Sequence, residues 1–519
     1  MTLYRGFATV GAMTILSRVL GFVRDVLIAA VLGAGATADA FFVAFRVPNL
    51  FRRLFAEGAF DSAFVPLFAK RLHGEGEGAA RAFAEQALAL LTVGLTAFTL
   101  IAELAMPWLM LVLAPGFTHD PAKFELAVML ARIALPYLLC MSLVALYSGM
   151  LNAIGRFAVA AFAPSLLNVV LIVVLLALIV LGVTSEVRAG VALAWGIALA
   201  GLAQVLVVAV AAARAAMPLS FSRPRLTPEM RRLIALAAPG VLAGGMAQLT
   251  VVLNTIIASF QDRVVSWLYY SDRLFQLPLG VIGVAIGVVL LPDLSRKLRA
   301  GDHQAVLTSE NRSLEFALLL TLPAAIALFL AADPIVRVLF EHGAFTAVDA
   351  RATAGMLSVF ALGLPAFVLI KVLHPSYFAR EDTKTPMLFA GLTMGANVML
   401  SLTLFAVLGS VGIAIATSLC GWLHVALLSH TLRQRGEFSL DAIFRRRFVG
   451  ILGASAAMAG VVWGLMALLD PWFGSTNGII VQVAALMALV AGGLGVYGVG
   501  AELFGAVTLR ALLASLRGS

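Results

Sequence analysis

The sequence predicts an all-α membrane protein that crosses a bilayer about fourteen times. Of its 519 residues, 62% are hydrophobic and only 12% are charged, whereas soluble domains have about 45–50% apolar and about 25% charged residues. Fourteen apolar stretches follow one another with short connections, and a membrane-spanning helix needs roughly 20 such residues. This composition excludes a soluble enzyme, a disordered or fibrous protein, and an outer-membrane barrel, whose strands alternate polar and apolar residues.

We expect one helix in each apolar stretch. In chain order the stretches are 7–32, 38–60, 82–113, 125–151, 157–182, 189–213, 233–259, 267–292, 313–340, 352–378, 386–407, 411–432, 449–469 and 478–507. Several contain a proline, among them Pro48, Pro136, Pro239, Pro278, Pro323 and Pro365. Proline kinks a membrane helix but is tolerated where neighbouring helices satisfy the freed backbone groups. So many broken spans favour a moving transporter over a rigid scaffold.

The first stretch is expected to be a helix of the mature protein. Residues 36–38 (Ala-Thr-Ala) resemble a signal-peptide cleavage site, but Arg18, Arg24 and Asp25 interrupt the apolar core that precedes it. A cleavable signal carries its charge before that core.

Basic residues indicate the orientation of the chain in the membrane. With the N-terminus inside, 23 of the 36 Lys and Arg residues fall in inner connections and only 4 in outer ones. Cytoplasmic loops carry such an excess, so an even number of helices places both termini in the cytoplasm. The net charge of +9 therefore reflects topology rather than a nucleic-acid partner.

A weak internal repeat suggests how the helices are grouped. AFVPLFAKRL at 63–72 is similar to VLLPDLSRKL at 289–298, although two basic loop entries can also match by chance. A parallel repeat of six helices would give an N-terminal lobe at 1–216 and a C-terminal lobe at 217–440. Residues 441–519 would add two further helices.

Nine basic residues lie at membrane level, and their charge is the main functional signal. They are Arg18, Arg24, Arg46, Arg52, Arg53, Arg132, Arg273, Arg337 and Lys371. Arg132 and Arg337 lie toward the outer ends of their spans, where a long side chain can reach the interface. Each of the others costs about 2.5–3.5 kcal/mol if it faces lipid at the bilayer centre. They must therefore face a hydrated cavity or pair with acids.

Two interpretations of these charges stay open. In the first, internal ion pairs hold helices together: Arg18 or Arg24 with Asp25, Arg52 or Arg53 with Glu57, and Arg273 with Asp272. In the second, the cations line a cavity for a phosphate-bearing substrate, because Arg suits phosphate through its planar fork. Seven cations face only four acids, Asp25, Asp39, Glu57 and Asp272, which favours the cavity.

Helical spacing groups the polar residues of the first two stretches on shared faces. Ser17 and Arg24 are seven residues apart, as are Arg18 and Asp25, which is close to two helical turns. In the second stretch, Arg46, Asn49, Arg52 or Arg53, and Glu57 recur at spacings of three to five. This pattern predicts a polar stripe on an otherwise apolar helix.

The sequence indicates no catalytic or metal chemistry. Cys140 and Cys420 lie inside apolar stretches, the seven His residues form no ligand pattern, and no GxxxxGK[ST] phosphate loop occurs. Such a loop would be needed for an ATP-driven pump of the common kind. His374 with Lys371 is the nearest candidate pair, and we interpret it as a packing or gating pair.

Three segments resemble one known family of membrane transporters. They are MTILSRVLGFVRDVLIAAVLGAGATADAFFVAFRVPNLFRRLFAEGAF at 13–60, SWLYYSDRLFQLPLGVIGVAIGVVLLPDLS at 266–295 and KVLHPSYFAREDTKTP at 371–386. They closely resemble the N-terminus, the eighth helix and the tenth-to-eleventh connection of the MurJ (MviN) lipid II flippases. The resemblance covers the whole chain.

The resemblance implies a fold of the multidrug/oligosaccharidyl-lipid/polysaccharide exporter superfamily. Two six-helix lobes would surround a central cationic cavity, and two C-terminal helices would form a groove for the lipid tail. The implied protein is a transporter rather than an enzyme. It would flip lipid II, the undecaprenyl-pyrophosphate-linked peptidoglycan precursor, across the bacterial inner membrane for cell-wall synthesis and cell shape.

The resemblance also assigns roles to individual residues. Residues implied in substrate binding are Arg18, Arg24, Arg52, Arg273, Ser17, Asn49 and Arg53. Residues implied in gating are Asp39, Glu57, Ser266 and Lys371. For Asp39, capping of its own helix is the alternative to a latch that accepts a hydrogen bond from Ser266. Gln276 departs from the Glu that relatives often carry.

Expectations about energy and partners follow from the same comparison. Relatives with a sodium site use acids in helices 7 and 11, but 233–259 and 386–407 contain none. We therefore expect no cofactor or metal, the membrane potential as driving force, and a coupling ion that the sequence does not identify. The expected partners are lipid II and membrane lipids, with no nucleic acid, and the protein is expected to be a monomer.

Rival functions make different demands on the sequence. An antiporter for cationic drugs would need an acidic cavity, and a glycosyltransferase would need an acid base or metal ligands with a large loop. A scaffold would leave the cations unexplained. A flippase for another polysaccharide lipid shares the pyrophosphate, and only the motifs favour lipid II over it.

Overall fold

The computed structural model describes residues 3–55, 59–474 and 477–506, and all regular structure in these ranges is helical. The chain divides into two compact units. Unit 1 comprises Met1–Ser266 with Gly343–Phe345, and unit 2 comprises Trp267–His342 with Thr346–Ser519. This division reflects packing within each unit. It does not test the expected division into 1–216, 217–440 and 441–519, which stays a prediction.

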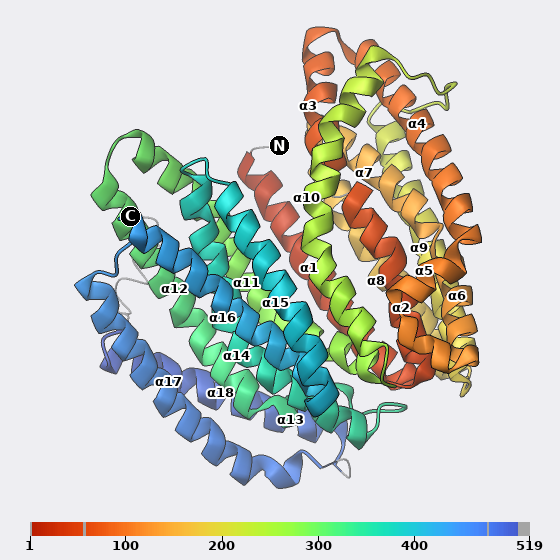
Figure 1. Ribbon diagram of the computed structural model, residues 1–519. Helices are drawn as coiled ribbons and strands as arrows, with labels where there is room; N and C mark the ends of the chain where they lie inside the picture. Colours follow the sequence, from red (N-terminus) through yellow and green to blue (C-terminus); the bar gives the residue numbers. More distant parts are fainter. Residues whose placement is uncertain (1–2, 56–58, 475–476, 507–519) are drawn as a thin grey trace. The chain divides into compact units, whose positions relative to one another are not determined.

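The helices of unit 1 follow one another with short connections (Figure 1). They are α1 (Leu3–Leu32), α2 (Ala36–Phe55), α3 (Ala59–Gly74), α4 (Glu77–Leu104), α5 (Met106–Leu113), η1 (Pro115–His119), α6 (Pro121–Ala134), α7 (Tyr137–Ala153), α8 (Phe157–Val180), α9 (Glu186–Arg214) and α10 (Pro228–Ala258). The buried core around α3, α4 and α7 includes Phe64, Phe68 and Phe83. The Phe64 ring stacks on that of Phe68 at a centroid distance of 5.6 Å and on that of Phe83 at 5.7 Å.

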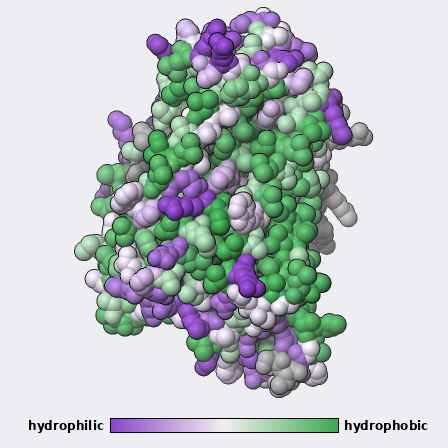
Figure 2. Space-filling model, turned by 90° about the vertical axis from the view of Figure 1, so that its right-hand side faces the viewer, coloured by the Kyte–Doolittle hydropathy of each residue, from purple (hydrophilic) through white to green (hydrophobic). Residues whose placement is uncertain are grey.

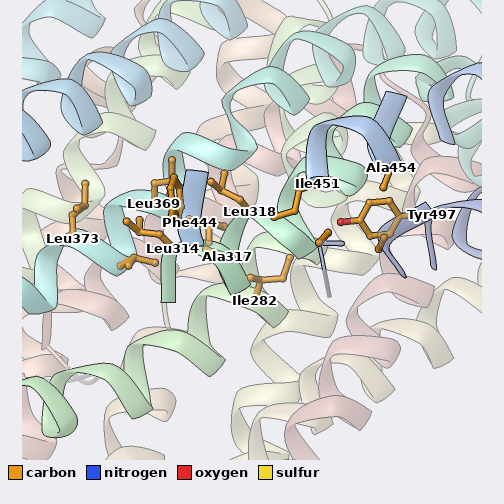
Figure 3. Packing of buried hydrophobic residues seen from close by; sticks show 14 of the residues in the cluster. Ile282, Leu314, Ala317, Leu318, Leu369, Leu373, Phe444, Ile451, Ala454 and Tyr497 are labelled. Atoms are coloured by element: carbon orange, nitrogen blue, oxygen red, sulfur yellow. The ribbon is translucent and has the colours of Figure 1, made fainter. Parts of the chain in front are cut away.

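Unit 2 begins within a long helix. Its helices are α11 (Val264–Arg299), α12 (His303–Leu330), α13 (Ala332–Phe340), α14 (Ala347–Phe378), α15 (Lys384–Leu408), α16 (Ser410–Gln434), α17 (Ala442–Leu469), η2 (Asp470–Trp472) and α18 (Ile479–Leu503). The last two α-helices lie side by side, and α17 also packs on α12 (Figure 1). Figure 3 shows side chains of α11, α12, α14, α17 and α18 gathered in one core, with Leu318, Ile451 and Tyr497 among them.

Most of these helices suit a bilayer. Among the described residues, ten helical segments are long and apolar enough to cross a membrane, so the expectation of an all-α polytopic fold is confirmed. The helices α1, α2, α10 and α11 are not among the ten. In α2, Asp39, Arg46 and Arg52 interrupt the apolar sequence. Fourteen crossings are consistent with the structure and stay a prediction.

Several predicted stretches contain two helices rather than one. The stretch 82–113 holds α4 and α5, and 125–151 holds α6 and α7. Pro107 and Pro136 stand at these junctions, where the missing N–H and the ring interrupt the helical ladder. Pro48, Pro323 and Pro365 lie inside continuous helices, so the kink sites are only partly predictable.

Lipid-facing surface explains why so many apolar residues remain exposed. In the apolar part of α4 only 28% of residues are buried, and in α15 only 17%. Figure 2 shows hydrophobic residues over much of the face on which α4 and α6 lie, with hydrophilic residues at the top and bottom of the view and in several patches between them. Such a face would aggregate in water but suits lipid.

An ion-pair cluster joins α12 to α17 within unit 2. Glu315 pairs with Arg312 one turn earlier and, through Oε2, with Arg447 Nη1 at 2.8 Å. Arg312 also pairs with Asp441, whose carboxylate caps the start of α17 by accepting from the Phe444 N–H. Only 9% of the Glu315 side chain is exposed, so two cations compensate one buried acid.

The turn between α14 and α15 is held by Asp382. Its Oδ1 accepts from the Thr385 N–H at 3.0 Å, and its Oδ2 accepts from Thr385 Oγ1 at 2.7 Å and from Arg435 Nη1 at 2.8 Å. The hydrogen bonds from Thr385, with a smaller contribution from Arg435, lower the pKa of Asp382 from 3.8 to about 2. The ionised carboxylate therefore stabilises this turn.

A pH-dependent effect follows from the depressed pKa of Asp382. Because the folded-state pKa is lower than the unfolded one, the stabilisation is fully present above about pH 4 and is lost as pH falls toward 2. At pH 6 we expect Asp382→Asn to cost about 1 kcal/mol, given the partly exposed site. Thermal unfolding of the purified protein in detergent checks this, and a cost that stays constant down to pH 2 would contradict it.

Candidate functional site

Arg24 is buried in unit 1 by partners from two helices. Its Nη2 and Nε donate to Asp25 Oδ1 at 2.7 and 3.0 Å, and its Nη1 donates to Asn168 Oδ1 of α8 at 2.8 Å. Asn168 in turn donates from Nδ2 to the backbone oxygen of Ser17 at 3.0 Å. Arg24 and Asp25 are 5% and 2% exposed, so their charges compensate each other, and of the two pairings that the ion-pair interpretation left open for Asp25 the structure contains the one with Arg24.

Other predicted residues of α1 and α2 are more accessible. Arg18 is exposed and Ser17 is half-buried. In α2, Arg52 is half-buried and donates from Nε to Asn49 Oδ1 at 3.3 Å, while Arg46 donates to the backbone oxygen of Val251 at 3.3 Å. The polar stripe predicted for this helix is thus present from 46 to 52. Glu57 lies outside the described residues, as does the side chain of Arg53.

Asp39 is the centre of a second buried cluster. It is fully buried at the start of α2, and its Oδ2 accepts from Lys123 Nζ at 2.7 Å and from the Arg263 N–H at 2.9 Å. Its Oδ1 accepts from the Ser266 N–H at 2.9 Å and from Ser266 Oγ at 2.6 Å. The carboxylate therefore sits against the first turn of α11, where helical N–H groups lack intrahelical partners.

The predicted contact between Asp39 and Ser266 is confirmed. The Asp39 carboxylate caps the N-terminus of α11, whereas the alternative prediction had it cap its own helix, α2. Both residues belong to unit 1, which ends at Ser266. Arg263 has a φ of 69°, a left-handed conformation that is rare for residues with a side chain. This turn directs its N–H to the carboxylate. The strained geometry indicates that the surroundings strongly favour the cluster.

Lys123 completes the Asp39 cluster and was not predicted as a site residue. It is 3% exposed, bonds Asp262 Oδ1 at 2.9 Å, and lies 4.4 Å from the centre of the Phe117 ring. By sequence it was counted as an outer loop cation. Asn168 was likewise missed, although an amide inside the apolar stretch 157–182 was a usable signal.

The candidates of unit 2 lie on two helices. Arg273 donates from Nη2 to Tyr269 Oη at 3.1 Å and stacks over that ring at 4.8 Å. Asp272, its predicted partner, bonds Gln276 one turn later. Lys371 is half-buried on α14. His374 lies 5.5 Å from His424 of α16, centroid to centroid, so its neighbour in the structure is another imidazole.

The arrangement of potential metal ligands and thiols bears on the expectation of no metal, which stays a prediction. No group of three or more His, Cys, Asp or Glu residues in the described part of the chain is arranged to hold a metal ion. Cys140 and Cys420 are both buried free thiols.

Two all-helical units with apolar helices of membrane length, and with the buried cations Arg24 and Lys123 among them, are typical of a polytopic membrane protein of the transporter type. The family model described as "Lipid II flippase MurJ" matches residues 28–481. A probable lipid II flippase MurJ of Rhizobium meliloti (strain 1021) is 46% identical over 498 residues, covering 96% of this chain and 93% of the relative. One of Rhizobium tropici is 44% identical, covering 100% and 97%.

Solved structures agree with this match. A structure titled "Lipid II flippase MurJ, inward closed conformation" superposes with a TM-score of 0.76 at 25% identity, covering 97% of this chain and 99% of that one. An inward-facing MATE family transporter of the MOP superfamily, at 15% identity, shares the fold with a TM-score of 0.66, covering 81% and 94%. The chain belongs to the lipid II flippase MurJ family, as its motifs predicted.

Proposed function

We propose that this protein is a lipid II flippase of the bacterial inner membrane. It moves the undecaprenyl-pyrophosphate-linked peptidoglycan precursor from the inner to the outer leaflet by alternating access, and so supplies cell-wall synthesis. The observation that supports this most strongly is the family match over residues 28–481, together with a relative that is 46% identical over nearly the whole chain.

The arginines contribute in different ways to binding of the pyrophosphate. Arg18 is exposed, so its guanidinium contacts phosphate oxygens directly, in the bidentate manner that suits Arg. Arg24 already donates hydrogen bonds to Asp25 and Asn168. It either replaces one of these partners by a phosphate oxygen or contributes by its place beside the other residues of the site. Arg52 and Arg273 complete the set, and Ser17, Asn49 and Arg53 supply neighbouring polar contacts.

A second set of residues controls gating, and the membrane potential supplies the driving force for transport. Asp39, Glu57, Ser266 and Lys371 control access. With the inside negative, outward movement of an anionic head is favoured by about 2.3 kcal/mol per charge per 100 mV. No cofactor takes part. The protein acts as a monomer, with both termini in the cytoplasm.

Complementation tests the proposal directly. Cells depleted of their own lipid II flippase receive this chain, and lipid II in the outer leaflet is measured by its accessibility to a reagent that does not cross the membrane. We expect accessible lipid II to return with this chain and to stay absent with its Arg18→Ala variant. Growth without any rise in accessible lipid II would refute the proposed function.

Topology gives an independent prediction. Loops at 223–232, 296–299 and 445–447 should be cytoplasmic, and those at 114–124 and 470–477 periplasmic, because basic residues are retained inside. A single cysteine at Lys297 should react only after the membrane is permeabilised, and one at Thr118 should react in intact cells. Labelling of position 297 from outside would overturn the helix count.

A further inference from the structure

A groove on unit 1 lies apart from the arginines and the cluster described above. Its volume is about 440 Å³, within the range of about 300–1,000 Å³ that is usual for ligand pockets. One wall comes from α6 and α7, namely Arg132, Ile133, Pro136 and Cys140. The other wall comes from α9, namely Trp195, Ala198 and Leu202.

The helical spacing explains how the groove forms. Arg132, Pro136 and Cys140 recur every four residues and so share a face, and Trp195, Ala198 and Leu202 recur at three and four. Because Pro136 has no N–H and its ring disfavours the preceding turn, the ladder opens between α6 and α7.

Farther along, the two walls approach closely. A Cβ on Gly201 would lie 2.8 Å from Cys140 Cβ and 2.9 Å from Tyr137 Cδ2. Only glycine permits this approach, which closes the groove beside Cys140. The groove is therefore narrow at the end where α9 meets Cys140.

Arg132 is the only charged residue in the lining. It is exposed, and its Nε donates to the backbone oxygen of Glu103 at 3.1 Å. Its two terminal nitrogens donate to no group in the described part of the chain. Arg132 lies eleven residues after the start of α6, about 16 Å along the helix, and Trp195 lies nine residues after the start of α9, about 14 Å along it. The cation and the indole thus lie at similar depth.

We propose that this groove binds one anionic phospholipid of the surrounding bilayer. An acyl chain occupies the apolar walls between Pro136 and Leu202, and the phosphate accepts hydrogen bonds from the terminal nitrogens of Arg132. Charge complementarity selects this occupant, since a lipid-facing guanidinium whose terminal nitrogens donate to no described group favours an anion. Trp195 suits the boundary between chain and headgroup, because indole has an apolar body and one polar donor.

Glu103 tunes the affinity of the proposed site. Its carboxylate is close enough to attract Arg132 electrostatically, so it competes with the phosphate for the same cation. Removing this charge should therefore strengthen binding of an anionic lipid, an effect that a purely structural arginine would not produce.

Native mass spectrometry of the delipidated protein tests the proposal. Palmitoyl-oleoyl phosphatidylglycerol, or phosphatidylcholine with the same chains, is titrated into wild type and variants. In Arg132→Gln the affinity for phosphatidylglycerol should fall about tenfold, as expected for loss of charge-assisted hydrogen bonds. Ala198→Trp should cause a similar loss by filling the groove, Glu103→Gln should bind more tightly, and phosphatidylcholine should respond weakly to every change.

Matched controls separate the groove from general effects. Leu199→Trp places the same ring on the neighbouring lipid-exposed position of α9, and Arg337→Gln removes a cation that already pairs with Asp333 and Glu341. Both should bind phosphatidylglycerol as wild type does. Equal affinities in wild type, Arg132→Gln and Ala198→Trp would overturn the proposal. So would a dependence on Arg132 that appears with undecaprenyl phosphate but not with phosphatidylglycerol.

Discussion

Asp39→Ala is expected to destabilise the protein by about 3–5 kcal/mol, the usual cost of breaking a buried ion pair. The substitution leaves Lys123 buried, with Asp262 as its remaining acidic partner, and the side chain of Asp262 is 86% exposed. It also removes the acceptor of the Arg263 and Ser266 N–H groups at the start of α11. Chemical or thermal unfolding in detergent measures the effect.

A double-mutant cycle identifies the source of this loss. Lys123→Met should also be strongly destabilising, because it leaves the Asp39 carboxylate without its cation. The combination of Asp39→Ala with Lys123→Met should cost less than the sum of the two single changes, with a coupling of about 1–3 kcal/mol. Strict additivity would show that the pair does not interact as the 2.7 Å distance indicates.

Transport distinguishes a structural role of Asp39 from a gating role. Asp39→Asn retains an acceptor for the α11 N–H groups, and Asn caps helices about as well as Asp. If Asp39 only caps α11, this variant should transport normally once expressed. A charged latch predicts loss of transport at near-normal protein level. Cysteines at 39 and 266 should crosslink, since the native side chains are in contact. A latch requires that the yield of this crosslink falls under transport conditions.

Arg18→Ala and Arg273→Ala should each abolish flipping while protein levels stay near normal. Arg18 is exposed and Arg273 half-buried, so neither change leaves a fully buried acid uncompensated. Lys at these positions should keep part of the activity if positive potential suffices, and lose most of it if bidentate contact with phosphate matters. Outer-leaflet lipid II in complemented cells is the readout.

Two comparisons sharpen the arginine series. Arg24→Ala should reduce protein level as well as transport, because Asp25 stays 2% exposed without its ion-pair partner. Arg351→Ala, at an exposed position that bonds only its own helix backbone, should behave as wild type. Active Ala variants at both 18 and 273 would leave the ion-pair interpretation as the better one.

Much of the fold was predictable because apolar stretches of membrane length are an unambiguous signal. What the sequence did not predict was where a stretch breaks. Pro136 ends α6 whereas Pro323 lies inside α12, and this difference depends on how neighbouring helices satisfy the freed backbone groups. The periodicity of a single stretch does not contain that information.

The candidate site shows the same division between local and distant information. The α2 stripe follows from helical spacing, the Arg24–Asp25 pair was one of the ion pairs left open by the sequence, and the contact of Asp39 with Ser266 was expected from the resemblance. Lys123 was missed because its partner is 84 residues away and its burial depends on the packing of α6 against α2. Lys123, which the sequence placed in an outer loop, is one of the most buried charged residues of unit 1.

The Glu315 cluster has a consequence for how the chain is made. Arg447 follows Glu315 by 132 residues, so at roughly 5–20 residues per second the ribosome reaches it about 7–26 s later. During that interval Arg312, one turn away on the same helix, is the cation that pairs with Glu315. The newly inserted α12 therefore carries its own counter-charge, and synthesis of α17 later adds a second cation. A chain that stops before residue 447 would therefore keep Arg312 as the partner of Glu315 and lack the ion pair that joins α12 to α17.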